Sequence, residues 1–400
     1  MKKLNENDNF ANLGIYSPVL LAIEDKKFIK ATEVQKRAIP LTIEDENLIV
    51  AAPTGSGKTL IFASRIIEVT ENSKGIQSLI LVPTRELAIQ VEEDIKYFSK
   101  YKPLNINSIS GGYSLKSQLI KLNESDVLIA TPGRLKEHIE ASNIDLSKVH
   151  MLVFDEMDAM LNPEFIEDIE LIISSIPRKR QTLMFSATIN KDVGKFAQKY
   201  MKKARRVLVD SNKDKKKTNL EQVFYLIETN KKLSLLSYLL TNESSGLSLV
   251  FVNRKEVGEF IIKNLKKLNL SFGFVHKNLS QSKRTKVLSG FKNQEFDVLI
   301  ATDIAARGLD VDGITHVYNY SIPLDQDKYI HRIGRCARAG KKGKVIDFIT
   351  GKDEEKFTKI LNEKKINSLR KNIPENLKEI EIKHQMQARN FKKEAKKIKK

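Results

Sequence analysis

The sequence predicts an α/β protein of two tandem units, each a parallel sheet with helices on both faces. Short apolar, β-branched runs recur along the chain of 400 residues, and stretches of helical length separate them. Continuous apolar strands that alternate with helices are typical of parallel sheets buried on both faces. The hexapeptide Asp-Val-Leu-Ile-Ala-Thr also occurs twice, at residues 126–131 and 297–302. This repeat favours duplication of one unit of ordinary domain size over a chance match between two strands.

The apolar runs fall into two series, which define the expected strands. The first series comprises residues 48–51, 78–84, 126–132, 151–156 and 182–188, and the second comprises residues 248–253, 272–276, 297–303, 316–320 and 344–350. A polar, charged stretch at 202–219 separates the two series, as is typical of a linker. We therefore expect a first domain at residues 1–205, a basic linker at 206–219, a second domain at 220–368 and a basic tail at 369–400.

The chain is strongly basic. It carries 69 Lys and Arg against 50 Asp and Glu, a net charge of +19 at pH 7. This balance favours a polyanionic partner, although a lysine-rich, merely solvated surface has the same composition. The basic stretch at 383–400 is likewise either a tether for nucleic acid or a solubilising tail.

The composition also predicts a compartment. No run of about eighteen apolar residues is present, so we expect no transmembrane helix and no membrane partner. The first residues lack the apolar core of a secretory signal. Cys336 is the single cysteine, which excludes an internal disulfide and a cysteine-based zinc site. We therefore expect a cytoplasmic protein.

A phosphate-binding loop follows the first apolar run. Its candidate nucleotide-binding residues are Ala52, Thr54, Gly55, Ser56, Gly57, Lys58 and Thr59. Gly55 and Gly57 let the backbone curl so that its N–H groups converge on one anion. Lys58 supplies positive charge for the β- and γ-phosphates, and the Thr59 hydroxyl is a ligand for Mg²⁺. Ala52 stands where the strict pattern has Gly, but the spacing of the other residues favours this loop over a glycine-rich turn with a surface lysine.

Two acids follow a later apolar strand. Asp155 and Glu156 come directly after the apolar run that begins at Met151. Side chains at the carboxyl end of a parallel strand emerge at the sheet edge where ligands bind. There Asp155 can hold Mg²⁺ through water, and Glu156 can polarise the attacking water. Acids at strand ends are common, but together with the phosphate-binding loop they indicate a nucleoside triphosphatase.

Several short polar segments complete the pattern. They are Pro83-Thr84-Arg85-Glu86-Leu87-Ala88, Gly111-Gly112, Thr131-Pro132-Gly133-Arg134, Ser186-Ala187-Thr188, Gln281-Ser282-Lys283-Arg284, Thr302-Asp303-Ile304-Ala305-Ala306-Arg307-Gly308-Leu309-Asp310 and His331-Arg332-Ile333-Gly334-Arg335-Cys336-Ala337-Arg338. With these segments in this order, the chain resembles a DEAD-box RNA helicase, a superfamily 2 ATPase with two RecA-like domains and a cleft between them. The resemblance runs from about Phe10 to about residue 339, with Met157 in place of the Ala of the family name.

The resemblance implies an ATP site to which both domains contribute. Phe10, Lys30 and Gln35 match the adenine-binding element, and the Gln35 amide offers a donor and an acceptor that suit the N6/N7 edge of adenine. The implied catalytic residues are Lys58, Asp155, Glu156, Arg335 and Arg338, and Asp310, Arg335 and Arg338 join the nucleotide-binding residues. Arginine forks stabilise the charge that spreads over a transferred phosphoryl group. ATP and Mg²⁺ are the implied cofactors.

The resemblance also implies an RNA site across both domains. The implied RNA-binding residues are Pro83, Thr84, Arg85, Gly111, Gly112, Thr131, Arg134, Gln281, Arg284 and Thr302, and those that couple the ATP state to unwinding are Asp158, Ser186, Thr188 and His331. Threonine hydroxyls, Gly-Gly amides and arginines at helix starts suit phosphates and sugars rather than bases. We therefore expect a monomer that binds single-stranded or short duplex RNA without sequence specificity and locally unwinds it, with RNA–protein complexes or ribosomal precursors as possible partners.

Two other functions remain open. Met157 replaces a usual Ala, Ala337 a usual Gly and Cys336 a usual Thr or Ser. A degenerate, non-hydrolysing RNA clamp is therefore one alternative to an RNA-dependent ATPase, and a DNA translocase of a related superfamily is the other. Cys336 also lies between arginines, which lower the pKa of a thiol, so a redox-sensitive cysteine is a further hypothesis.

Overall fold

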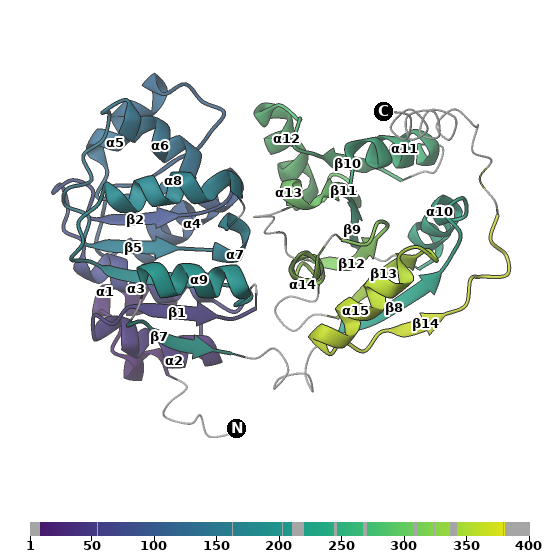
Figure 1. Ribbon diagram of the computed structural model, residues 1–400, viewed down its shortest axis with the longest axis horizontal. Helices are drawn as coiled ribbons and strands as arrows, with labels where there is room; N and C mark the ends of the chain where they lie inside the picture. Colours follow the sequence, from purple (N-terminus) through teal and green to yellow (C-terminus); the bar gives the residue numbers. More distant parts are fainter. Residues whose placement is uncertain are drawn as a thin grey trace. The chain divides into compact units, whose positions relative to one another are not determined.

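The chain folds into two compact units, shown in Figure 1. The computed structural model describes residues 9–53, 55–161, 163–201, 203–209, 220–243, 246–266, 270–306, 311, 313–323, 325–336, 342–378 and 380. We call the described residues up to Val209 unit 1 and those from Leu220 onward unit 2. Thr54, Asp310, Ala337, Arg338 and the basic stretch 383–400 lie outside the described residues. Within the described residues, no helix is long and apolar enough to cross a bilayer.

Unit 1 is built on a sheet of seven parallel strands. They are β1 (Leu48–Ala51), β2 (Ser78–Leu81), β3 (Ile106–Ile109), β4 (Val127–Ala130), β5 (Met151–Phe154), β6 (Gln181–Ser186) and β7 (Arg205–Leu208). Their order across the sheet is β3-β4-β2-β5-β6-β1-β7, and every pairing is parallel. The carboxyl ends of all these strands therefore lie at one edge of the sheet.

Helices cover both faces of this sheet. They are η2 (Phe10–Leu13), α1 (Ser17–Asp25), α2 (Glu33–Ile43), α3 (Lys58–Val69), α4 (Arg85–Phe98), η3 (Lys116–Gln118), α5 (Leu119–Glu124), α6 (Pro132–Glu140), α7 (Met157–Met160), α8 (Pro163–Ser174) and α9 (Lys191–Tyr200). In β1, Leu48 and Val50 pack in one apolar cluster with α1 to α4, whereas Ile49 packs in a second cluster with α6 to α9. Two buried faces explain why the strands are continuous apolar runs.

Unit 2 contains a second sheet of seven parallel strands. They are β8 (Leu220–Leu226), β9 (Leu247–Val252), β10 (Phe272–Val275), β11 (Val298–Thr302), β12 (Ile314–Asn319), β13 (Gly343–Ile349) and β14 (Leu369–Lys371). The helices are α10 (Lys232–Asn242), α11 (Lys255–Leu265), α12 (Gln281–Lys292), α13 (Asp303–Ala306), α14 (Gln326–Ile333) and α15 (Glu354–Lys364). The order of the strands across the sheet is β10-β11-β9-β12-β13-β8-β14.

The two sheets have the same topology. In chain order, each sheet runs third, fourth, second, fifth, sixth, first and seventh strand. The repeated hexapeptide lies at the fourth strand of each unit, β4 and β11. A shared strand order with the repeat at the same place supports duplication, and the predicted fold class of two tandem α/β units is confirmed.

The structure corrects the strand predictions at the sheet edges. Residues 206–208, expected in the linker, belong to β7, and residues 369–371, expected in the tail, form β14. In β7 Val207 is buried and its neighbours are exposed, and in β14 all three residues are exposed. An edge strand buries little and commonly carries charge, so no apolar run marks it in the sequence. The short strand β3 and the alternating strand β8 also lay outside the expected series.

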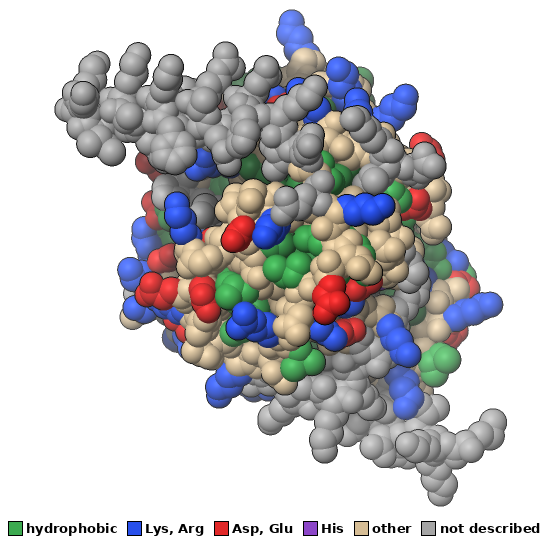
Figure 2. Space-filling view, turned by 90° about the vertical axis from the view of Figure 1, so that its right-hand side faces the viewer, with side chains coloured by type: hydrophobic (Ala, Val, Ile, Leu, Met, Phe, Trp, Pro, Cys, Tyr) green, Lys and Arg blue, Asp and Glu red, His purple; other side chains and the backbone are tan. Residues whose placement is uncertain are grey.

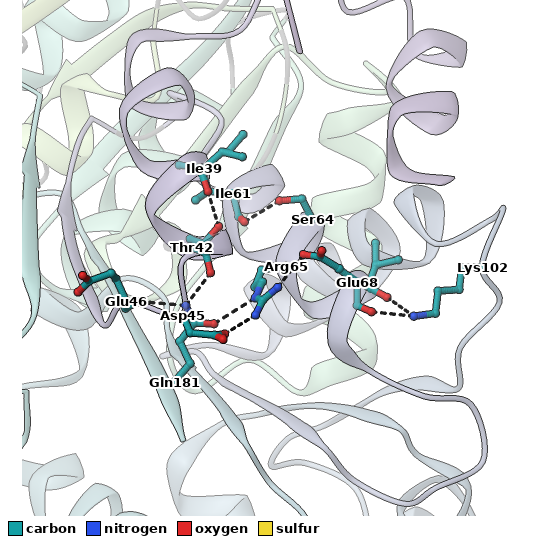
Figure 3. Close-up of polar contacts among 11 residues, drawn as sticks. Ile39, Thr42, Asp45, Glu46, Ile61, Ser64, Arg65, Glu68, Lys102 and Gln181 are labelled. Carbon is teal, nitrogen blue, oxygen red and sulfur yellow. Dashed lines mark hydrogen bonds and ion pairs between the residues drawn. The ribbon is translucent and has the colours of Figure 1, made fainter. Parts of the chain in front are cut away.

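A buried arginine joins three elements of unit 1, as Figure 3 shows. Arg65 of α3 is 9% exposed, pairs with Asp45 and donates to Glu68 Oε2 at 2.8 Å and to Gln181 Oε1 at 3.4 Å. Gln181, the first residue of β6, in turn donates to the backbone oxygen of Thr42 near the end of α2 at 2.8 Å. These contacts hold the end of α2 against α3 and β6.

We expect Arg65→Met to lower the free energy of unfolding of unit 1 by about 1–3 kcal/mol. Methionine keeps much of the packing but leaves the buried Gln181 oxygen without its charged donor. Asp45 is 75% exposed, so its ion pair contributes little to this loss. Urea unfolding followed by circular dichroism measures the change. The exposed Lys179→Met is the control, and an unchanged midpoint for Arg65→Met would contradict the expectation.

Candidate functional site

The segments singled out in the sequence follow strands at the same edge of each sheet. In unit 1, the segments expected to bind RNA follow β3, β4 and β2, and those expected to bind ATP or to couple the ATP state to unwinding follow β5, β6 and β1. Each group of three strands is contiguous in the sheet. Unit 2 repeats this division, because Gln281 follows β10 at the start of α12 and Thr302 ends β11, whereas His331 and Arg335 follow β12. Ligand-binding residues of open parallel sheets gather at this edge.

The phosphate-binding loop connects β1 to α3. Gly55 and Gly57 have φ values of +77° and +86°, a left-handed conformation that glycine adopts without strain. Lys58 begins α3, and its Nζ donates to the backbone oxygens of Ala52 at 2.8 Å and Pro53 at 3.0 Å. The loop thus curves over the N-terminal end of α3, where free N–H groups and the helix dipole favour an anion.

Gln35 is bonded to the phosphate-binding loop. Its Nε2 donates to the Gly57 backbone oxygen at 3.0 Å, and its Oε1 accepts from the Thr32 N–H at 2.8 Å. The Thr32 hydroxyl donates to the Ser56 backbone oxygen at 2.8 Å. A side chain at position 57 would meet Gln35, because a Cβ there would lie 2.4 Å from its Nε2. The residue expected to recognise adenine is therefore also a brace of the phosphate-binding loop.

The other two residues of the expected adenine element differ in exposure. Phe10 is 4% exposed and packs in the apolar cluster of α1 to α4. Lys30 is exposed in the segment between α1 and α2. The structure thus gives Phe10 a packing role in this cluster, and its part in adenine binding stays a prediction.

The acids of the candidate site lie where β5 ends. Asp155 is 5% exposed, and burial raises the pKa of its carboxyl to about 7. The charge of Lys58 lowers this pKa and that of Glu156 raises it, so the three groups share one electrostatic environment. Glu156 has a φ of 53° at the start of α7, an uncommon left-handed conformation for a residue other than glycine. Met157, which stands in place of the Ala of the family name, is fully buried in the apolar cluster of α6 to α9.

The expected coupling residues of unit 1 are in contact with one another. The backbone N–H and the hydroxyl of Thr188 each donate to Asp158 Oδ2 at 3.3 Å. The Ser186 hydroxyl, at the end of β6, donates to the Thr188 backbone oxygen at 2.6 Å. The acid segment after β5 is thereby linked to the segment after β6.

The expected RNA-binding residues of unit 1 form a second cluster. Thr84 caps α4 by accepting from the Leu87 N–H, and the buried Pro83 precedes it. Gly112 has a φ of +94°, and a Cβ there would lie 3.3 Å from Arg85 Nη1. The cluster further contains the exposed Gly111, the half-buried Thr131 at the start of α6, and Arg134, which is 8% exposed. Backbone amides, a hydroxyl and two guanidinium groups therefore meet at this edge.

In unit 2 the expected site residues lie on three elements. Gln281 begins α12, and Arg284 Nη2 donates to the Ala305 backbone oxygen at 3.2 Å. Thr302 ends β11 and is half-buried. His331 lies in the last turn of α14, and Arg335 follows this helix and is 5% exposed.

The sequence analysis missed a buried arginine within the same segment. Arg332 of α14 is 1% exposed and donates to Asp303 Oδ2 at 2.9 Å, to Asn253 Oδ1 at 2.8 Å and to the Ser321 backbone oxygen at 2.6 Å. It also donates to Asn319 Oδ1 at 3.1 Å. One guanidinium thus ties α14 to the ends of β9, β11 and β12. Its place within a segment of three arginines was a signal, but only the fold shows that Arg332 bonds to the strand ends of unit 2.

The network extends to a buried acid in β13. Asp347 is fully buried, accepts from Asn319 Nδ2 at 2.7 Å and from the Tyr329 hydroxyl at 2.9 Å. Burial raises the pKa of the Asp347 carboxyl to about 7. Because Tyr329 belongs to α14, Asp347 also holds this helix, through the Tyr329 hydroxyl. An acid within the apolar run 344–350 was the sequence signal that marked this position.

Cys336 does not have the surroundings of a reactive thiol. It is 5% exposed, and its Sγ lies 3.1 Å from the backbone oxygen of Thr315. Redox-sensitive cysteines are accessible and sit in electropositive surroundings as thiolates. The burial of Cys336 therefore counts against the hypothesis of an oxidation-sensitive thiol, which stays untested.

Fold and site together define a class: a nucleoside-triphosphate-binding protein with two tandem parallel α/β units. Comparison with family models places the chain more closely. Residues 32–196 match the DEAD/DEAH box helicase model, and residues 231–340 match the helicase conserved C-terminal domain.

Known proteins resemble the chain along most of its length. The DEAD-box ATP-dependent RNA helicase CshA of Geobacillus kaustophilus is 39% identical over 346 residues, which are 86% of this chain and 74% of that protein. The CshA helicase of Limosilactobacillus reuteri is 38% identical over 343 residues, which are 85% of this chain and 69% of that protein. Among solved structures, S. cerevisiae Dbp5 bound to RNA and ADP BeF3 superposes with a TM-score of 0.84 and 26% identity, covering 98% of this chain and 100% of that one. Mss116 bound to single-stranded RNA and UDP-BeF has a TM-score of 0.80 and 27% identity, covering 92% and 80%.

The chain therefore belongs to the DEAD-box family of ATP-dependent RNA helicases. The predicted family and the predicted pair of RecA-like units are confirmed.

Proposed function

We propose that this DEAD-box helicase hydrolyses ATP when RNA brings units 1 and 2 together, and that this closure pries apart short duplexes or remodels RNA–protein complexes. The observation that carries the proposal is the arrangement of the two sheet edges. In each unit the segments for ATP and those for RNA lie on adjoining halves of one edge, so both ligands can engage both units. Binding of either ligand then favours binding of the other.

ATP binding is assigned to unit 1. The triphosphate would lie on the phosphate-binding loop at the start of α3, with Lys58 moving from its backbone contacts to the phosphate oxygens. Gln35 still has a second amide hydrogen and a second lone pair for adenine, because each group makes one hydrogen bond within the protein. Its bond to Gly57 would couple recognition of the base to the shape of the loop.

The site also fits Mg²⁺. Asp155 and Thr59 offer the oxygen ligands that this ion prefers. Burial raises the pKa of Asp155 to about 7, so a nearby cation would stabilise its carboxylate. In the described part of the chain no three acids, histidines or cysteines are grouped to hold a metal. Mg²⁺ would therefore share its ligands with phosphate and water, and would supply charge neutralisation of the triphosphate.

Hydrolysis needs a base and a stabiliser of transition-state charge. Glu156 would orient the attacking water and accept its proton, while Asp155 would serve as an oxygen ligand for Mg²⁺. Arg335 and Arg338 of unit 2 would stabilise the charge on the transferred group. Since Glu156 and these arginines belong to different units, the catalytic set is complete only after closure.

RNA binding is assigned to the clusters around Arg85 in unit 1 and Arg284 in unit 2. Their donors suit phosphates and sugars, so the expected binding has no sequence preference. Net charge alone does not locate this surface. On the face of the molecule that Figure 2 shows, basic side chains are interspersed with acidic ones among the described residues. We infer further that the helicase acts as a cytoplasmic monomer on RNA–protein complexes or ribosomal precursors.

Steady-state phosphate release with and without single-stranded RNA tests the proposal. We expect RNA to stimulate the wild-type rate, and Lys58→Ala to lower the stimulated rate about 10²-fold because a charge aimed at the phosphates is lost. The exposed Lys179→Ala is the matched control and should behave as wild type. A flat, near-zero rate with intact RNA binding would favour the non-hydrolysing clamp. Stronger stimulation by single-stranded DNA than by RNA would favour the DNA translocase.

A further inference from the structure

Tyr113 is a half-exposed aromatic residue among the expected RNA-binding groups of unit 1. It follows Gly112 directly, and 53% of it is exposed. No role was expected for it, because it belongs to none of the short segments that carry the family resemblance. A large aromatic ring that is exposed beside a glycine turn and two arginines indicates a binding site for a ligand that covers the ring.

Two arginines of the candidate RNA site hold Tyr113 in place. The guanidinium carbon of Arg85 lies 3.8 Å from the centre of the Tyr113 ring, so the planar cation stacks on one face of the ring. Arg134 Nη1 donates to the Tyr113 backbone oxygen at 2.8 Å. Gly112 lies against the same arginine, since a Cβ there would come within 3.3 Å of Arg85 Nη1. Arg85 therefore contacts the ring of Tyr113, and Arg134 holds its backbone.

An open groove begins at this ring. It has a volume of about 620 Å³, and Arg85, Tyr113, Ile89, Ser110, Gln118 and Lys121 are among the residues that line it. Ile89 of α4 is 40% exposed and adds apolar surface on the same side as the arginine. The volume lies within the range of small-molecule sites, so a nucleobase has room beside the ring.

We propose that Tyr113 is a stacking platform for one base of the bound RNA strand. The inference rests on the proposed function, since it deepens the RNA site of unit 1. A phosphate held by Arg85 and the glycine turn places the attached base within reach of the ring, which is half exposed and lines the groove. Base–aromatic stacking raises affinity roughly 5- to 150-fold and tolerates every base, with purines stacking more strongly than pyrimidines.

The competing explanation is that Tyr113 acts only by orienting Arg85. The two roles differ in what they require of the ligand. Stacking needs a base but adds no ionic contact, so its loss leaves the salt dependence of binding unchanged. If Tyr113 only orients Arg85, the contact needs a phosphate and no base. Loss of Tyr113 then changes the salt dependence of binding, and it weakens binding of an abasic strand as much as binding of a strand with bases.

Binding of short RNA strands by the full chain separates these roles. The probes are oligo(rA), oligo(rU) and a strand of the same length with abasic sites, each titrated at several salt concentrations with ADP-BeF. The variants are Tyr113→Leu, Tyr113→Phe and Arg85→Ala. Tyr101→Leu is the matched control, because Tyr101 is also exposed with a lysine over its ring but lies beyond the far end of α4.

We expect Tyr113→Leu to weaken oligo(rA) binding roughly 5- to 20-fold, to weaken oligo(rU) less, and to leave the abasic strand and the salt slope unchanged. Tyr113→Phe and Tyr101→Leu should bind as wild type, whereas Arg85→Ala should lower the salt slope by about 0.7. Equal weakening of the abasic strand, or unchanged oligo(rA) binding, would overturn the platform. Failure of the proposed function is distinguishable, because wild-type protein would then bind no strand and Arg85→Ala would change nothing.

Discussion

The Glu156→Gln variant is expected to keep its affinity for ATP and RNA while its rate of hydrolysis falls roughly 10²- to 10⁴-fold. The substitution preserves the shape of the side chain and removes the group that accepts the proton of the attacking water. Glu156 sits at the start of α7 with a φ of 53°, beside the buried Asp155 whose Oδ1 accepts its N–H at 3.0 Å. The backbone there is held independently of the carboxylate, so the loss should be confined to chemistry.

Single-turnover hydrolysis and equilibrium binding of a fluorescent ATP analogue measure the two properties separately. Glu167→Gln, an exposed acid on α8, is the matched control and should hydrolyse ATP as wild type does. A wild-type rate in Glu156→Gln would remove Glu156 from the mechanism. A joint loss of nucleotide affinity and hydrolysis would instead assign it a binding role.

The second large effect is expected at Arg332, where we expect Arg332→Lys to lower kcat of RNA-stimulated hydrolysis about 10²-fold. Arg332 is a positioning residue, since it holds α14 through Asp303, Asn253 and Asn319, and α14 carries His331 and leads into Arg335. Lysine keeps the charge but has no planar fork that reaches all these partners at once. A displacement of about 1 Å at a catalytic group can cost 10²-fold in rate.

Affinity for ATP should stay unchanged in Arg332→Lys, because the phosphate-binding loop belongs to unit 1. Tyr329→Phe removes one hydroxyl bond to Asp347 and leaves the arginine contacts in place, so it should lower kcat less and still fold. Arg370→Lys, an exposed arginine in β14, is the control. A wild-type kcat in both Arg332→Lys and Tyr329→Phe would show that the network serves stability alone.

Much of the fold was predictable because its strands carry their own signature. A parallel strand buried on both faces is a continuous apolar run, as in β2 and β5. The edge strands β7 and β14 bury little, so the same reasoning assigned them to a linker and a tail. Their places depend on pairing with β1 and β8, which are distant in the sequence.

The candidate site likewise has parts that were predictable from the sequence and parts that were not. The phosphate-binding loop was predictable because its chemistry is local: two glycines with positive φ, a lysine and a threonine at fixed spacing. The bond between Gln35 and Gly57 was not predictable, since it joins segments that lie apart in the chain. The burial of Phe10 likewise depends on packing against helices that follow it in the sequence.

The family and the tandem α/β architecture were predictable from the sequence alone, because both follow from short runs of residues in a recognisable order, and the catalytic segments stay a prediction. Which segments are neighbours depends on the tertiary structure. The strand order places the ATP segments on one half of each sheet edge and the RNA segments on the other. It also sets Tyr113 between Arg85 and Arg134, and buries Arg332 among four partners at the ends of three strands. The physical reason is that hydrogen bonding and stacking act over a few ångströms of space, and sequence separation does not measure that distance.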